Sequence, residues 1–246
     1  MLKRYERVAY ELLRPEQVAA LRKKTPIAYV PAGSLEWHSF QNPLGCDALK
    51  AHAVCCEAAL RHGGIVLPPV YQGLLGKGWG PKGWEDYTLG YNTQRTFEAL
   101  ILGIASALVA ADWRVIVGVT GHDVPEQRLG LARSIARATK GRRATGFAVM
   151  EGDLQKPGHG LPFWMDHAGA WETSCMLYAC PGKVNLGDFR RHRVTRGDDL
   201  DIRGPEGIGG KDPAKYASAL LGRRIVGKMG DLIGRRARGM LKGLRT

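Results

Sequence analysis

Short apolar runs rich in β-branched residues alternate along this chain with longer segments of helical spacing. The runs predict strands at residues 27–31, 65–70, 115–119 and 144–150. Helical spacing marks the segments between and after them, at residues 46–62, 93–111, 125–140 and 168–179. Strands that alternate with helices form a mainly parallel sheet with helices on both faces. The sequence therefore predicts an α/β fold.

The remaining segments carry weaker signals. Residues 71–92 are rich in Gly, Trp and Tyr without a sustained period, and residues 151–166 are rich in Gly and Pro, so both are expected to be loops. We expect an extended arm at residues 184–203 and a terminal helix from Asp212 onward. A chain of 246 residues can bury a large core, and we expect one domain over residues 1–246.

The net charge of +13 makes the protein strongly basic, and much of the excess lies near the carboxyl terminus. Residues 211–245 hold ten Lys or Arg residues against only Asp212 and Asp231. A basic segment can bind nucleic acid or an anionic membrane. Here no nucleic-acid-binding motif accompanies it and no aromatic residues interleave with it, so we expect no nucleic-acid partner. We interpret the segment as a solvated tail helix or an oligomer contact; a nucleic-acid-binding protein is the less favoured alternative.

The cysteines and the hydropathy pattern bear on the compartment. The five cysteines are an odd number and show no zinc-ribbon spacing, so we expect reduced, mostly buried thiols in a cytoplasmic protein. Charged residues interrupt every apolar stretch near the amino terminus, and no signal peptide is expected. No apolar run reaches the roughly 18 residues needed to cross a bilayer, so no membrane partner is expected.

A carboxylate, an imidazole and a second carboxylate follow the first expected strand. Glu36 and His38 lie in the run Gly-Ser-Leu-Glu-Trp-His, and Asp47 follows at the start of the next helix. If the chain leaves the strand extended, Glu36 and His38 point the same way, because side chains alternate along extended backbone. Carboxylate oxygen and imidazole nitrogen suit zinc, manganese or iron. On spacing alone, however, such a cluster more often belongs to a polar surface loop than to a metal site.

Two further polar clusters lie near the ends of later strands or in the loops that follow, where sites of α/β folds gather. Their ligand-capable residues are His122, Asp123, Glu126, Asp166, His167 and Glu172. A histidine at a strand–helix junction is well placed to bind a ligand, but many such histidines cap helices. His167 and Glu172 are five residues apart, about one and a half helical turns, so they need not share a helical face.

Together the three clusters resemble the creatininase (creatinine amidohydrolase) family. The family pattern has a Gly-Ser-x-Glu-x-His element, an Asp after a Leu-Gly step, a Gly-His junction and a His-Ala-Gly-x-x-Glu-Thr-Ser helix start. This chain supplies all of them in order, at residues 33–38, 44–47, 121–122 and 167–174. The resemblance covers about residues 27–184 and does not cover residues 185–246. It implies the family's α/β fold and a homo-oligomer, up to a hexamer.

The resemblance also implies two divalent metal ions, Zn, Mn or Fe, bound by residues at matching positions. Glu36 and His38 each bind one metal, and Asp47 bridges the two. His122 joins the first metal, and Glu172 completes the second. Creatininase places a Glu two residues after the junction histidine, where this chain has Val124. Two other acidic residues therefore stay open as substitutes for Glu172, namely Asp123 and Glu126.

The implied reaction is hydrolysis of an amide (C–N) bond in a small, cyclic substrate by a metal-activated water. His167 is the candidate that protonates the leaving nitrogen, with Asp166 or Glu126 as its orienting partner. The alternative at the same site is hydrolysis of a C–C bond in a cyclic ketone such as a dehydro-inosose. The altered junction puts creatinine itself in doubt as the substrate.

Aromatic residues of the two expected loops are candidates for substrate binding. Flat aromatic walls suit a small ring and exclude water, which favours Trp84 and Trp164. Asp123 is a further candidate for substrate binding. Each of these tryptophans can equally well pack a loop or a subunit contact.

Overall fold

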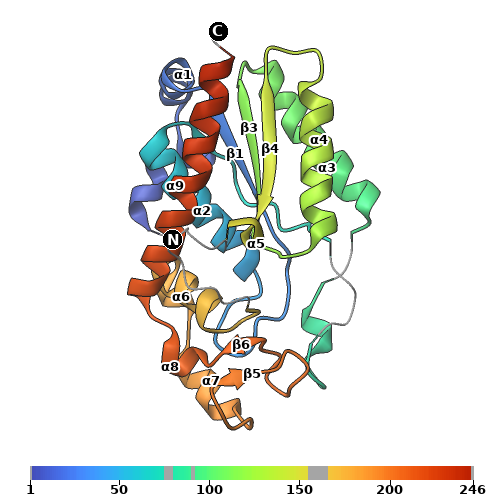
Figure 1. The fold of residues 1–246 in the computed structure, drawn as a ribbon, viewed down its shortest axis with the longest axis vertical. Helices are drawn as coiled ribbons and strands as arrows, with labels where there is room; N and C mark the ends of the chain where they lie inside the picture. Colours follow the sequence, from blue (N-terminus) through green and yellow to red (C-terminus); the bar gives the residue numbers. More distant parts are fainter. Residues whose placement is uncertain (1, 75–79, 90–91, 155–165, 245–246) are drawn as a thin grey trace.

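A parallel four-stranded sheet lies at the centre of the molecule (Figure 1). The computed structural model describes residues 2–74, 80–89, 92–154 and 166–244. The strands are β1 (Ile27–Ala32), β2 (Ile65–Val66), β3 (Val115–Thr120) and β4 (Thr145–Met150), and their order across the sheet is β2-β1-β3-β4. The chain therefore reverses its direction across the sheet between β1 and β3. Such a reversal opens a ligand-binding crevice at the carboxyl ends of the two strands.

Helices cover both faces of the sheet, which confirms the predicted fold class. On one face lie α2 (Cys46–His62) and α9 (Ala219–Gly243), with α6 (Ala170–Ala179) packed against both. On the other face lie α3 (Gln94–Ala110) and α4 (Pro125–Thr139). Because side chains alternate along a strand, each strand contributes to both cores.

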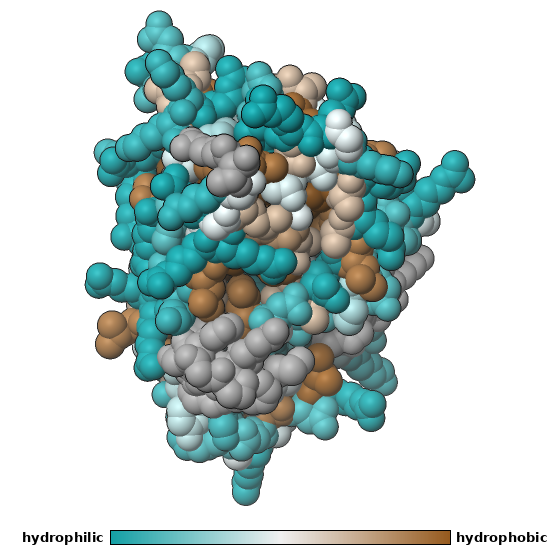
Figure 2. Space-filling view, turned by 45° about the horizontal axis from the view of Figure 1, so that its top comes forward, coloured by the Kyte–Doolittle hydropathy of each residue, from teal (hydrophilic) through white to brown (hydrophobic). Residues whose placement is uncertain are grey.

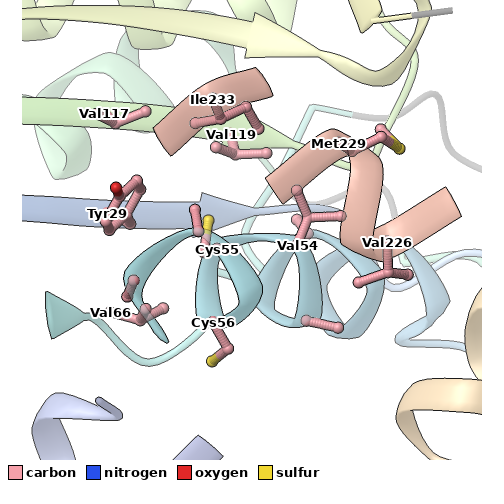
Figure 3. Packing of buried hydrophobic residues seen from close by; sticks show 14 of the residues in the cluster. Tyr29, Val54, Cys55, Cys56, Val66, Val117, Val119, Val226, Met229 and Ile233 are labelled. Carbon is pink, nitrogen blue, oxygen red and sulfur yellow. The ribbon is translucent and has the colours of Figure 1, made fainter. Parts of the chain in front are cut away.

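The first core lies between the sheet and helices α2 and α9. Figure 3 shows Val119 of β3 beside Ile233 of α9, and Cys55 of α2 pointing toward Tyr29 of β1. Cys56 points to the opposite side of α2 in the same view. All five cysteines are buried and free, as expected from the sequence.

Several element boundaries follow from local sequence. Helix α2 has the predicted bounds because Gly63, with a φ of 87°, ends it. The side chain of Thr93 caps α3 by accepting a hydrogen bond from the N–H of Thr96. The strand expected at residues 65–70 ends early, since Pro68 and Pro69 have no N–H to donate.

The prediction of an extended arm at residues 184–203 is wrong. Within it lie α7 (Leu186–His192) and the short strand β5 (Asp199–Leu200), which pairs antiparallel with β6 (Gly210–Lys211). A small core of its own stabilises this segment, built by Ala168, Phe189, Leu200 and Ile208. The remaining short elements are η1 (Lys3–Arg7), η2 (Tyr10–Leu12), α1 (Pro15–Lys24), η3 (Glu85–Tyr87), α5 (Glu151–Leu154), η4 (Pro181–Lys183) and α8 (Pro213–Tyr216).

The basic carboxyl-terminal segment is not a solvated tail helix. Ser218 separates α8 from α9 and caps α9 by accepting from the N–H of Leu221. Helix α9 is amphipathic: its apolar residues recur every four positions and are buried, and its Arg and Lys residues lie mainly on the exposed side. The buried stripe runs through Ile225, Met229, Ile233, Ala237 and Leu241. The positive charges thus belong to the outer face of a core helix.

The surface is mainly hydrophilic on the face drawn in Figure 2, with hydrophobic residues in smaller patches. Among the helices of the described residues, none combines the length and the hydrophobicity that crossing a bilayer requires.

Candidate metal centre

The ends of β1 and β3 bring two of the polar clusters together. The last residues of these strands, Ala32 and Thr120, are paired in the sheet, so the segments that follow them leave the same edge side by side. Glu36 and His38 follow β1, and His122 follows β3. The first turn of α2 adds Asp47 between them.

Two glycines allow α2 to approach the strand ends this closely. A Cβ atom at Gly121 would lie 2.1 Å from the carbonyl oxygen of Asp47, and one at Gly33 would lie 2.2 Å from the backbone nitrogen of Ala48. Either contact is far inside van der Waals distance, so only glycine fits at these two places. The Gly-Ser and Gly-His steps of the sequence therefore have a packing reason in addition to their place in a motif.

His122 faces two carboxylates with one ring nitrogen. Its Nδ1 lies 3.0 Å from Glu36 Oε2 and 3.0 Å from Asp47 Oδ2. The other nitrogen, Nε2, lies 2.9 Å from the carbonyl oxygen of Leu74 and donates to it. All three side chains are buried.

His38 repeats this arrangement with its nitrogens exchanged. Its Nδ1 lies 3.1 Å from the carbonyl oxygen of Glu36 and donates to it. Its Nε2 lies 3.1 Å from Asp47 Oδ1 and 3.4 Å from Glu172 Oε2. Asp47 therefore lies between the two histidines and presents a different oxygen to each of them.

These contacts fit a pair of metal ions. An imidazole that donates from one nitrogen to a carbonyl carries a lone pair on the other nitrogen when it is neutral. In both histidines this lone pair faces carboxylate oxygens, an arrangement that is stable only with a cation or a proton between them. In the described part of the chain, no hydrogen-bond donor satisfies Glu36 Oε2 or Asp47 Oδ2, although both are buried. Glu36, Asp47 and His122 lie within ligand distance of one another, as do His38, Cys46 and Glu172.

The electrostatics of the cluster favour cation binding. Burial alone lowers the pKa of His122, but Asp47 and Glu36 raise it to about 10. Burial acts the same way on His38, and Asp47 and Glu172 raise its pKa well above the usual value. Burial raises the pKa of Asp47, but the two histidines outweigh it and hold that pKa well below its usual range. Asp47 thus stays charged and attracts protons or metal ions strongly.

Glu172 comes from the first turn of α6, and a buried lysine holds it. Its Oε2 accepts a hydrogen bond from the N–H of Ala168 at 2.6 Å. Its Oε1 pairs with the ammonium group of Lys50, which also lies 2.6 Å from Glu151 Oε2. Neither Lys50 nor Glu151 was expected at the site from the sequence. The available signal was a lysine one turn after Asp47 in a stretch of helix rich in alanine.

His167 lies against the same cluster. Its ring centroid is 4.4 Å from that of His38, and its Nε2 lies 2.8 Å from the carbonyl oxygen of Trp37. The carboxylate of Asp166 caps α6 by accepting from the N–H groups of Trp171 and Glu172, at 2.5 and 3.2 Å. Burial, together with His38, lowers the pKa of His167.

Glu126 is the expected site residue that the fold does not bring here. It is exposed in the first turn of α4 and is absent from the described residues that line the central cavity. Its carbonyl oxygen accepts from the side chain of Gln94, at 3.4 Å, on the outer side of α3. A role for Glu126 in orienting His167 or in replacing Glu172 therefore has no geometric support.

A cavity of about 820 Å³ opens onto the cluster. One wall is the carboxyl-terminal segment that carries β5 and β6, and Asp123 lies on another side. The described residues that line the cavity include no Lys or Arg; they are Glu36, Asp47, His122, Asp123, Val124, Asp166, His167, Glu172, Asp199, Leu200, Asp201, Ile202, Gly209 and Gly210. The pocket is therefore acidic, in contrast to the basic protein around it.

Trp84, one of the two tryptophans expected to bind substrate, is not among the described residues that line the cavity. Trp84 packs in an aromatic cluster with Trp37, Phe40 and Tyr87, at ring-centroid distances of 5.1 to 5.4 Å. Trp164 lies outside the described residues.

The sequence and the fold resemble those of known proteins. A model of the family described as creatinine amidohydrolase matches residues 11–235, well beyond the range of the motifs. A crystal structure of creatinine amidohydrolase (creatininase) is 22% identical, with a TM-score of 0.73 over 94% of this chain and 98% of that chain. No curated protein sequence matches the chain.

Two further solved structures share the fold. A creatininase described as the Mn form is 21% identical, with a TM-score of 0.74 over 95% of this chain and 98% of that one. A mutant creatininase in complex with creatine is 23% identical, with a TM-score of 0.71 over 94% and 98%. None of these comparisons favours the C–C bond alternative. The chain belongs to the creatininase family and is a metal-dependent amidohydrolase.

Proposed function

We propose that this protein opens an amide bond in a small, cyclic substrate that is neutral or cationic, with two divalent metal ions at the centre. One metal is bound by Glu36, Asp47 and His122, and the other by His38, Asp47 and Glu172. The observation that carries the proposal is the pair of buried imidazoles, each oriented by a backbone carbonyl and each directed at two carboxylate oxygens. Zn, Mn and Fe all suit this mixture of oxygen and nitrogen donors.

When bound, such a metal pair lowers the pKa of water and polarises a carbonyl group. The protein's own groups supply orientation and proton transfer. The Trp37 carbonyl holds His167 at the edge of the cluster, where its ring lines the cavity. From there a neutral His167 can accept a proton from the attacking water and pass it to the leaving nitrogen. Asp166 fixes the start of α6 and thereby the position of Glu172.

The cavity limits the class of substrate. Its volume of about 820 Å³ is in the usual range for small-molecule sites, and residues of α6 and of the β5–β6 segment form part of its lining. The acidic lining disfavours anionic substrates, because a carboxylate far from the metals would meet Asp123 or Asp201. We also propose a homo-oligomer in the cytoplasm; the five free cysteines agree with a reducing compartment.

The test combines elemental analysis of the purified protein with a screen of lactams, formamides and cyclic diketones, followed by mass spectrometry. We expect about two metal equivalents per chain and hydrolysis of a cyclic amide. Asp47→Asn should weaken metal binding by more than about 100-fold, because it changes a proposed ligand itself rather than a residue behind a ligand. Turnover of diketones alone would favour C–C hydrolysis, and full activity of metal-free protein would exclude the proposal.

A further inference from the structure

Lys50 is a lysine with no exposed surface, one helical turn after Asp47 on α2. Lysine is rarely buried unless it is paired, because moving an ammonium group out of water is costly. Here its Nζ contacts two carboxylates that come from distant parts of the chain, Glu172 on α6 and Glu151 directly after β4. The reaction outlined above assigns no role to Lys50 or to Glu151.

The contacts divide the two oxygens of Glu172 between different partners. Oε1 pairs with Lys50, while Oε2 accepts from the N–H of Ala168 and lies 3.4 Å from His38 Nε2. The last torsion of a glutamate side chain is soft, so a carboxylate held at one oxygen can still rotate. Held at both oxygens, it cannot turn Oε2 away from His38.

Glu151 in turn holds Lys50. Its Oε2 lies 2.6 Å from Lys50 Nζ, and its Oε1 is buried without a hydrogen-bond partner among the described residues. Glu151 does not line the cavity. The ammonium group therefore lies between a carboxylate that faces His38 and a carboxylate behind it.

We infer that Lys50 is a positioning residue for the metal that binds at His38. It holds Glu172 with Oε2 directed toward that metal, and Glu151 keeps Lys50 in place. The inference rests on the proposed metal centre. A purely structural role is the competing explanation, in which Lys50 only neutralises the buried carboxylate of Glu151.

Two substitutions separate the roles. Lys50→Met keeps the volume of the side chain and removes its charge, which leaves Glu151 Oε2 and Glu172 Oε1 without the ammonium group. Glu151→Gln removes the negative charge that the competing explanation requires. Its amide oxygen can still accept a hydrogen bond from Lys50, so the contact between Lys50 and Glu172 should be retained. The double variant Lys50→Met/Glu151→Gln has no charge at Glu151 left to neutralise. His38→Ala is the reference for loss of the metal position at His38.

The measurement is titration of metal-stripped protein with Mn²⁺ by calorimetry, with thermal melts of the stripped variants as a folding control. The binding step that His38→Ala abolishes should weaken 10- to 100-fold in Lys50→Met, the range for residues that orient a ligand. The same loss is expected in the double variant. Glu151→Gln should bind both ions nearly as wild type does, and the other binding step should stay unchanged throughout.

Wild-type affinity in Lys50→Met would overturn the inference. Recovery of metal affinity in the double variant would also overturn the inference, because the only role of Lys50 would then be to neutralise Glu151. If Lys50→Met does not fold, the double variant decides between the same two results. A wild-type protein that binds fewer than two Mn²⁺ ions contradicts the proposed metal centre itself, and this outcome differs from retention of both ions by Lys50→Met.

Discussion

At the scale of single residues, orientation matters as much as identity. The motifs predicted which carboxylates and imidazoles meet, but not the two backbone carbonyls, of Glu36 and Leu74, that set the ring orientations. The positions of those carbonyls depend on the path of the folded backbone, which the spacing of residues in a motif does not specify. Lys50 was missed for a related reason: a lone lysine in a helix usually extends into solvent, whereas this one is buried against two carboxylates, Glu151 and Glu172, that are distant in sequence.

A buried histidine outside the metal cluster, His52, predicts how stability depends on pH. Burial lowers the pKa of His52 to about 4, below the usual value of 6.5. Between these values the unfolded chain binds a proton that the folded protein does not, so stability falls as the pH decreases from 6.5 toward 4. From pH 7 to pH 5, this residue should remove about 2 kcal/mol from the free energy of unfolding.

Urea denaturation of wild type and His52→Met at both pH values measures this contribution. The variant should lose about 2 kcal/mol less than wild type between pH 7 and pH 5. Equal losses in the two proteins would mean that His52 is protonated in the folded state as readily as in the unfolded one.

For helices and strands, the sequence predicted a boundary correctly where a single residue determines where the element begins or ends. Gly63 ends α2 at the predicted position, and Thr93 begins α3. The segment from α7 to α8 could not be predicted, since its elements are short and are held by contacts with distant residues rather than by a period of their own. A terminal helix was predicted from Asp212 onward, but the seven basic residues of α9 concealed the apolar stripe on its other side.

The close contact between α2 and the end of β3 gives the first element-scale prediction. Gly121→Ala places a methyl group where the carbonyl oxygen of Asp47 lies, so α2 must shift. We expect a loss of about 1–3 kcal/mol in stability and a marked loss of metal affinity, because Asp47 moves with the helix. Gly103→Ala is the control: its Cβ meets nothing within 4 Å, and alanine there should stabilise α3 by about 0.5–1 kcal/mol. Wild-type metal binding in Gly121→Ala would contradict the packing argument.

The buried side of α9 gives a second prediction about the stability of an element. Ile233 is 1% exposed and packs between α9 and the sheet, so Ile233→Ala should reduce the free energy of unfolding by about 2–5 kcal/mol. Arg223 lies on the exposed side of the same helix, and Arg223→Ala should change it by less than about 0.5 kcal/mol. Chemical denaturation of the two variants compares them. A small effect at Ile233 would restore the interpretation of this segment as a solvated tail.

At the scale of the whole molecule, the metal centre joins parts that are otherwise separate layers. Its proposed ligands come from the loops after β1 and β3, from α2 and from α6, so bound metal links the sheet to the helices on one face. Removing metal with a chelator should therefore lower the melting temperature of the entire protein. At metal concentrations of about 100 times the dissociation constant, one ion contributes about 2.7 kcal/mol, which corresponds to roughly 5–10 °C for a protein of this size.

Differential scanning calorimetry before and after chelation, and after Mn²⁺ is added back, measures this shift. His38→Ala should show a smaller shift than wild type, because one of the two positions is gone. If chelation leaves the melting temperature of wild type unchanged, the proposal that the cluster binds a stabilising metal ion is contradicted.

The wall formed by β5 and β6 has a consequence for the order in which the protein becomes active. The backbone of His167 pairs with Gly209, and residues 199–210 enclose the cavity, yet every proposed ligand is translated before them. A growing chain on the ribosome thus acquires its full set of metal-binding side chains while the cavity is still open to solvent. The wall that β5 and β6 form requires the last fifth of the sequence. A product truncated near residue 185 would therefore keep the proposed ligands but lose this wall. It would also lose α9, the helix that packs against α2 and α6.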